Sequence, residues 1–174
     1  MTIALQFATV NYTQETDMKR GEMLAKMIHI ATNAHDGQFD KSGMPYILHP
    51  LKVMHYLKTD DEELQCIALG HDVIEDTDVT YADLRDAGVS ERVVQGIAAL
   101  TKLPGETLAE YKTRVFANAD AMRVKLCDLR HNSDIRRLKG MRQKDIERMA
   151  KYNLFYLEIL AKMEELKINV DTTE

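Results

Sequence analysis

The feature that most limits how this chain can fold is the helical spacing of its apolar residues, which recurs along most of its length. In residues 16–34, for example, Leu24, Met27 and Ala31 share one face of a helix. Glycine and proline, which interrupt helices, number only 8 and 3 among 174 residues. The one strand candidate is residues 5–10, LQFATV. The sequence therefore predicts an all-α domain of about eight helices.

The predicted helices begin at residues that are typical of helix ends. Residues 80–83, Thr-Tyr-Ala-Asp, resemble a capping box, and Ser90 is a candidate N-cap. A loop with Gly37, Gly43 and Pro45 separates the first two helices. The helices after the first are predicted over residues 49–57, 60–77, 90–100, 108–116, 120–132 and 143–166.

Length and composition are those of one globular domain. The chain is 45% hydrophobic and 29% charged, and 174 residues suffice for a core. No run approaches the roughly 18 apolar residues of a membrane span. The net charge of −5 argues against general nucleic-acid binding. Cys66 and Cys127 lie in apolar segments, as buried thiols of a reducing cytosol do. We therefore expect a cytoplasmic protein that binds neither membranes nor nucleic acid.

The stretch LGHDVIEDTD, residues 69–78, places four ionisable groups inside an apolar run. On a continuous helix, His71 would align with Glu75, and Asp72 with Asp76. A solvated acidic helix end is the simpler interpretation, but the apolar neighbours weaken it, because buried charges are costly unless they are paired or bound to a metal. Imidazole and carboxylate together suit Mn²⁺, Fe²⁺ or Zn²⁺. The stretch is therefore a candidate for part of a metal site.

Two residues elsewhere in the chain are candidates for further ligands. His49 stands at the start of a predicted helix in PYILHP, and Asp128 follows an apolar stretch in VKLCDLRHN. Each also has a simpler interpretation, His49 as a helix cap or core histidine and Asp128 as a surface carboxylate. The residues alone leave both interpretations open.

Three motifs together resemble a known family. GQFDKSGMPYILHP, ALGHDVIEDT and VKLCDLRHN are similar, in order and spacing, to the signatures of the HD-domain hydrolases of the RelA/SpoT type. The single-domain small alarmone hydrolases, including metazoan SpoT homologues, fit best. The likeness covers about residues 20–160 of a single predicted domain at 1–174, and we expect no synthetase domain within it. It implies an HD-domain helical bundle that hydrolyses ppGpp or pppGpp to GDP or GTP and pyrophosphate.

The resemblance also implies roles for individual residues. Glu75 and Asp76 match the acidic pair that handles the attacking water. The implied metal is Mn²⁺, and its ligands would be His49, His71, Asp72 and Asp128. The implied contacts with the nucleotide substrate are Lys41, Ser42, Asn132 and Tyr152. His35, in AHDGQ, and His131 are expected to have structural roles.

The acidic net charge of the whole chain does not favour so anionic a substrate, but one segment of the chain is basic. Residues 123–144 carry eight Lys or Arg against two Asp. A solvated basic helix face is the simpler interpretation. A basic rim that draws phosphates toward the metal is the alternative, and on that interpretation Arg130 and Arg137 join Lys41 as candidate phosphate ligands.

The sequence departs from the family pattern at three places. Asp40 replaces the usual Arg of an Arg-Lys-Ser-Gly loop, which leaves base preference and affinity open. Leu129 and Arg130 are exchanged relative to the usual order. Gly70 replaces the usual Leu, costs roughly 1 kcal/mol of helix preference, and is expected to leave space beside the metal.

Other functions remain open at this point. A related HD hydrolase could act on ppApp-type alarmones or on the 2′-phosphate of NADPH, whereas the KSGxPYxxHP loop argues against a 5′-nucleotidase or a cyclic-nucleotide phosphodiesterase. A non-catalytic nucleotide-binding module is disfavoured by Glu75 and Asp76, which mere binding does not require.

Overall fold

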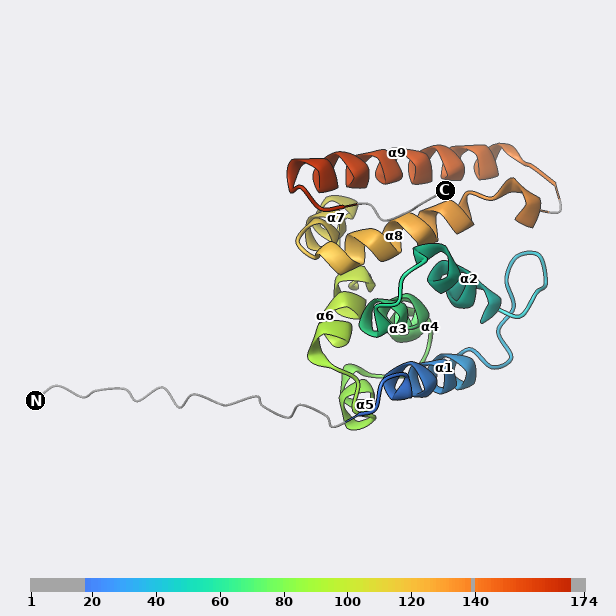
Figure 1. Ribbon diagram of the computed structural model, residues 1–174. Coiled ribbons are helices and arrows are strands. Elements are labelled where there is room, and N and C mark those ends of the chain that lie inside the picture. The colour runs from blue at the N-terminus through green and yellow to red at the C-terminus, as the bar shows by residue number, and fades with distance from the viewer. Residues whose placement is uncertain (1–17, 139, 170–174) are drawn as a thin grey trace, which may run out of the picture.

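The computed structural model describes residues 18–138 and 140–169, and the elements within them are helical (Figure 1). Apart from an isolated bridge between Phe39 and Pro45, these residues contain no β-structure. The predicted all-α fold is therefore confirmed. The strand candidate at residues 5–10 lies outside the described part of the chain. None of the described helices is long and apolar enough to cross a membrane.

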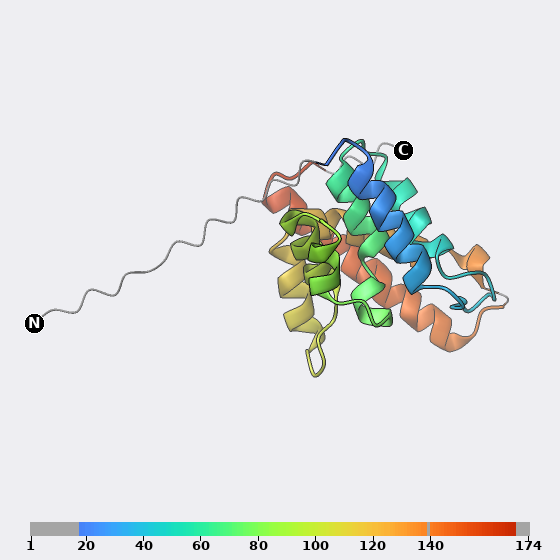
Figure 2. The same ribbon diagram turned by 90° about the horizontal axis from the view of Figure 1, so that it is seen from below.

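The helices form a bundle in which α3 is central. The elements are α1 (Glu22–Ala34), α2 (Leu48–Leu57), α3 (Glu62–Gly70), α4 (Val73–Asp76), α5 (Tyr81–Asp86), α6 (Glu91–Leu100), α7 (Leu108–Phe116), α8 (Ala119–Asn132), the 3-10 helix η1 (Ile135–Arg137) and α9 (Gln143–Glu165). Helix α3 packs against α1, α2, α6 and α8. Helix α9 lies along α8 on one side of the bundle, and α1 and α5 lie on the opposite side (Figures 1 and 2).

The core has two apolar clusters, and α8 contributes to both. One face of α8 places Val124 and Cys127 in the cluster formed with α1 to α6. Its other apolar residues, such as Leu126 and Leu129, pack with α7 and α9. Because α8 is buried from two sides, a polar side chain on it, such as Asp128, is held at a fixed place within the bundle.

The helix ends match the predicted ones where they depend on local capping residues. Thr80 and Asp83 form the predicted capping box at the start of α5. The Ser90 side chain caps α6 by accepting from the Val93 amide. Helix α3 starts where the Asp61 carboxylate accepts from the amides of residues 63 and 64. These ends follow from contacts within three residues, which the sequence alone contains.

The predicted continuous helix over residues 60–77 is wrong, because the chain leaves the helix at His71 and Asp72. The His71 ring bonds the Ala68 carbonyl at 2.7 Å, which a continuing helix would offer to the amide of residue 72. The expected space beside Gly70 is also absent. A Cβ at Gly70 would lie 2.5 Å from Ile97 Cδ1, so Gly70 permits the close approach of α3 and α6.

Candidate metal centre and adjoining pocket

The four predicted metal ligands come together from three parts of the fold. His49 is on α2, His71 and Asp72 follow α3, and Asp128 is on α8. Ligand atoms of His49, His71 and Asp72 all lie within 4.8 Å of one another. Asp128 joins them, with its Oδ1 3.1 Å from His49 Nε2 and 3.8 Å from His71 Nε2. Two imidazoles and two carboxylates therefore face one small volume.

Neighbouring groups orient the two imidazole rings. The bond from His71 Nδ1 to the Ala68 carbonyl requires a proton on Nδ1, so Nε2 faces the cluster. His49 Nδ1 lies 2.7 Å from His131 Nδ1, so His131 contacts a predicted ligand on the side away from the cluster. The two Nε2 atoms, of His49 and His71, are only 3.2 Å apart. A shared cation would accept both lone pairs, so these residues fit a transition-metal site.

The electrostatics of the cluster also favour bound positive charge. Burial alone would lower the pKa of His71, but Asp72 and Asp128 outweigh burial and raise it to about 10. Burial would raise the pKa of Asp128, yet Lys125 and the two histidines hold it well below its usual range. Lys125 Nζ is 2.8 Å from Asp128 Oδ2 and largely buried.

The two acidic residues of α4 are held by different parts of the molecule. The Tyr46 hydroxyl lies 2.6 Å from Asp72 Oδ2 and 3.5 Å from Asp76 Oδ2, so it ties Asp76 to a predicted ligand. Burial, Asp72 and Glu75 raise the pKa of Asp76. Glu75 instead accepts from the Lys102 amide at 3.0 Å. Because the helix is interrupted after Gly70, the expected alignment of His71 and Glu75 on one continuous helix does not apply.

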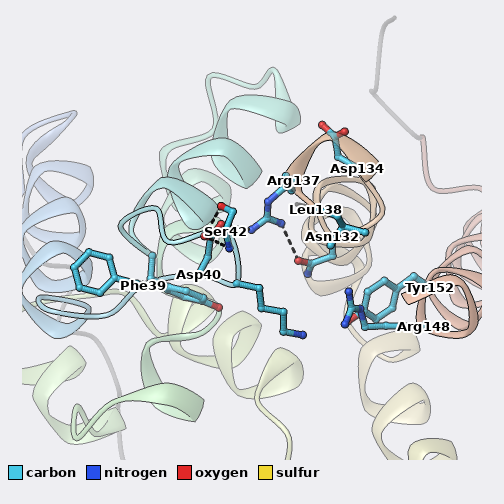
Figure 3. Close-up of a pocket in the computed structure, with 11 residues that line it drawn as sticks. Phe39, Asp40, Ser42, Asn132, Asp134, Arg137, Leu138, Arg148 and Tyr152 are labelled. Atoms are coloured by element: carbon cyan, nitrogen blue, oxygen red, sulfur yellow. Dashed lines mark hydrogen bonds and ion pairs between the residues drawn. The ribbon is translucent and has the colours of Figure 1, made fainter. Parts of the chain in front are cut away.

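A pocket of about 340 Å³ adjoins the cluster. The α1–α2 loop, η1 and α9 form its walls, with Phe39, Asp40 and Ser42 on one side and Arg148 and Tyr152 on the other (Figure 3). The predicted substrate contacts that line it are Lys41, Ser42, Asn132, Arg137 and Tyr152. Its volume is in the range of small-molecule sites.

Arg130 is the one predicted substrate contact that does not line this pocket. Its guanidinium lies over the Tyr56 ring, 4.5 Å from the ring centre, and the side chain is on the outer surface of α8.

Arg148, on α9, lines the pocket but was not predicted from the sequence. Arg148 lies one turn before Tyr152 and lines the pocket with it. The four-residue spacing between Arg148 and the predicted contact Tyr152 could have indicated it from the sequence.

Asp40 does not leave a free carboxylate in the pocket. Its Oδ1 accepts from the Ser42 amide at 2.8 Å and the Ser42 hydroxyl at 2.6 Å, and its Oδ2 pairs with Arg137 at 3.2 Å. Burial would raise the pKa of Asp40, but these hydrogen bonds hold it well below its usual range. Asp40 therefore shapes the α1–α2 loop and joins it to η1.

Asn132 connects the pocket with the His/Asp cluster. Its Nδ2 donates to Asp128 Oδ1 at 2.5 Å, and its Oδ1 accepts from Arg137 at 3.1 Å. One side chain thus contacts both a predicted metal ligand and a cation of the pocket. A ligand in the pocket would lie beside the predicted metal position.

Comparison with known proteins gives relatives by sequence and by fold. No family model matches the chain. It is 38% identical over 138 residues to the guanosine-3′,5′-bis(diphosphate) 3′-pyrophosphohydrolase of Haemophilus influenzae, which is 72% of this chain and 20% of that protein. It is 37% identical over 157 residues to the bifunctional (p)ppGpp synthase/hydrolase SpoT of Escherichia coli, 82% of this chain and 21% of that protein. The chain thus spans about a fifth of the length of these relatives.

A solved structure shares the fold. It belongs to a metazoan ortholog of SpoT that hydrolyzes ppGpp, and it matches with a TM-score of 0.64 and 21% sequence identity. The match covers 87% of this chain and 99% of that one.

Proposed function

We propose that this chain, a homologue of the RelA/SpoT-type HD-domain proteins, is a metal-dependent guanosine-3′,5′-bis(diphosphate) 3′-pyrophosphohydrolase. It would convert ppGpp or pppGpp to GDP or GTP and pyrophosphate. The observation that carries the proposal is Asn132, which bonds both Asp128 in the His/Asp cluster and Arg137 in the pocket. A nucleotide in that pocket would lie with a phosphate next to the metal ligands.

The cation would be held by two imidazoles and two carboxylates, and we propose Mn²⁺, which this donor set suits. Its ligands would be His49, His71, Asp72 and Asp128. When bound, a divalent cation polarises a phosphoryl oxygen and makes the attacking water more acidic. Lys125 and Asn132 would keep the Asp128 carboxylate in place from behind, since both donate to it.

Glu75 and Asp76 would position the attacking water and take its proton. The raised pKa of Asp76 suits proton transfer nearer neutral pH. Because Glu75 and Asp76 are adjacent carboxylates, we assign the role to the pair. Water would attack the phosphorus nearest the ribose. The bond from that phosphorus to the 3′ oxygen breaks, the 3′ oxygen takes up a proton, and pyrophosphate leaves.

The pocket would bind the rest of the nucleotide. Lys41, Arg137 and Arg148 would neutralise phosphate charge, while Ser42 and Tyr152 supply hydroxyl groups and a ring for the nucleoside. We further propose that residues 1–174 belong to one HD domain. We also propose that it acts in the cytoplasm, because buried free thiols are typical of proteins in a reducing compartment.

The test is turnover by the purified protein. With Mn²⁺ and ppGpp it should release GDP and pyrophosphate in equal amounts, and EDTA should stop the reaction. Glu75→Gln should lower kcat by about 10²–10⁴-fold. Glu91→Gln, which alters an exposed ion pair with Arg85, is the matched control. Metal-loaded protein that binds ppGpp without turnover would overturn the proposal. Parallel assays with pppGpp, ppApp and NADPH decide the preferred substrate.

A further inference from the structure

The carboxylate of Glu75 is held by a loop that is distant in sequence. The amide of Lys102, just after α6, donates to Glu75 Oε2 at 3.0 Å. The Lys102 ammonium is 4.0 Å from the other oxygen of Glu75. About a third of the Glu75 side chain is exposed (34%), and Lys102 itself is exposed. The place of Glu75 therefore depends on the orientation of one peptide group.

Arg114, on α7, holds that peptide group through its neighbours. Its guanidinium donates to the Ala98 carbonyl at 2.5 Å and to the Thr101 carbonyl at 2.6 Å. The Thr101 carbonyl belongs to the same peptide group as the Lys102 amide. A bond to this carbonyl therefore fixes the direction in which the Lys102 N–H points.

Glu106 holds Arg114 in place, and we call Arg114 and Glu106 together the clamp. It pairs with Arg114 through two bonds of 2.6 and 2.7 Å. It also accepts from the Leu103 amide at 3.1 Å, one residue after Lys102. The Glu106 side chain is only 8% exposed. A bidentate pair shielded in this way holds its geometry better than an open surface pair does.

We propose that Arg114 is a positioning residue for Glu75, acting through the Lys102 peptide group. The inference rests on the proposed water-handling role of Glu75. Between Lys102 and Gly105 the loop is exposed, so without the clamp its peptide groups would turn more freely. Glu75 would then lose its fixed donor. A small displacement of a group that orients water reduces kcat and leaves substrate binding unchanged.

The experiment compares two arginines that both make several ion pairs. Arg92 contacts Asp61, Glu63 and Asp120, and none of these touches Glu75, so Arg92→Met is the matched control. With Mn²⁺ and ppGpp, Arg114→Met should lower kcat by about 10–100-fold. KM and Mn²⁺ affinity should change less than about twofold, and Arg92→Met should change neither kcat nor KM by more. If Arg114→Met does not fold, Arg114→Lys and Glu106→Gln take its place.

A double-mutant cycle separates positioning from general destabilisation. In the Glu75→Gln background, a substitution of Arg114 should lower kcat by less than about twofold, because the group it positions is already changed. An equal loss in both backgrounds would overturn the inference, as would a loss that appears in KM.

A second readout does not depend on catalysis. Hydrogen exchange at the Lys102 amide should be slow in the wild type and at least about tenfold faster in the Arg114 variant. If the wild type turns over no nucleotide, the proposed function fails and the exchange measurement alone decides the inference. Unchanged exchange would then refute it.

Discussion

The His/Asp cluster and the pocket lie on either side of Asn132 and are built differently. His49, His71 and Asp128 are almost fully buried; His49 and Asp128 come from helices that pack against α3, and His71 directly follows α3. The pocket is lined by half-buried or exposed residues from a loop, a 3-10 turn and α9. The cluster depends on helix packing, whereas the pocket depends on a few polar contacts between loops. Substitutions in the cluster should therefore reduce stability and turnover, whereas substitutions in the pocket should mainly change substrate affinity.

The largest effect is expected on the cluster side, from Asp128→Ala. It removes a proposed ligand and leaves the buried Lys125 ammonium without its carboxylate. We expect a loss of about 3–5 kcal/mol in unfolding free energy. Turnover should fall by at least about 10³-fold, equivalent to roughly 4 kcal/mol. Urea unfolding, metal content and ppGpp turnover measure these changes. Asp86→Ala, at an exposed position, is the control. A variant with full turnover would disprove the ligand assignment.

Asn132→Ala tests the connection between the two sides. It removes donors and acceptors that join Asp128 to Arg137. Because such outer partners tune ligands, we expect Mn²⁺ affinity or kcat to fall about 10–100-fold, and KM should rise as well. Titration with Mn²⁺ measures the metal affinity, and steady-state kinetics measure kcat and KM. Asn153→Ala, which loses only a bond to the Met149 carbonyl, is the matched control. A change in KM alone would place Asn132 with the pocket.

On the pocket side, Asp40→Asn should change substrate affinity and leave the metal untouched. It removes a negative charge and frees Arg137 for phosphate, so KM for ppGpp should fall roughly threefold at low salt. Asp36→Asn, exposed in the same loop, is the control. A rise in KM would show that the loop geometry matters more than the charge.

Asp40 should also make the folding stability depend on pH. The pKa of Asp40 is lower in the folded protein than in the unfolded chain. Its carboxylate therefore stabilises the folded loop above pH about 4 and stops doing so as the pH falls through the folded pKa. The difference in unfolding free energy between wild type and Asp40→Asn should shrink at acid pH.

The smallest effect is expected at the cysteines. Burial raises the pKa of Cys66 and of Cys127 to about 12. At pH 8 both thiols should stay protonated and resist iodoacetamide, although Cys127 precedes a proposed ligand. Mass spectrometry of native and urea-treated protein measures this. Rapid labelling of Cys127 in native protein would show that the packing of α8 opens.

Much of the fold can be predicted because it depends on near neighbours in the chain. The helical spacing and the caps at Thr80 and Ser90 involve residues three or four apart. The interruption at His71 could not be predicted in this way, because it accompanies a side-chain bond to Ala68 and close packing of Gly70 on Ile97. Local sequence contains neither the tilt of that ring nor the distance between α3 and α6.

The candidate site divides in the same way. Charge pattern made Arg130 and Arg137 equally good candidates, yet only Arg137 lines the pocket. Arg130 points away, over Tyr56. Which side of α8 faces the pocket is set by the two apolar clusters that bury this helix.

By itself, the sequence determined the helical class, since periodicity is a property of short segments. The four side chains that converge at the cluster were implied by the resemblance of three short motifs to a known family. Only the tertiary structure decided how the acidic pair is held. Asp76 contacts Tyr46 from the α1–α2 loop, whereas Glu75 contacts Lys102 after α6. Adjacent residues acquire different partners because hydrogen bonds depend on which distant segments the packed helices bring within reach.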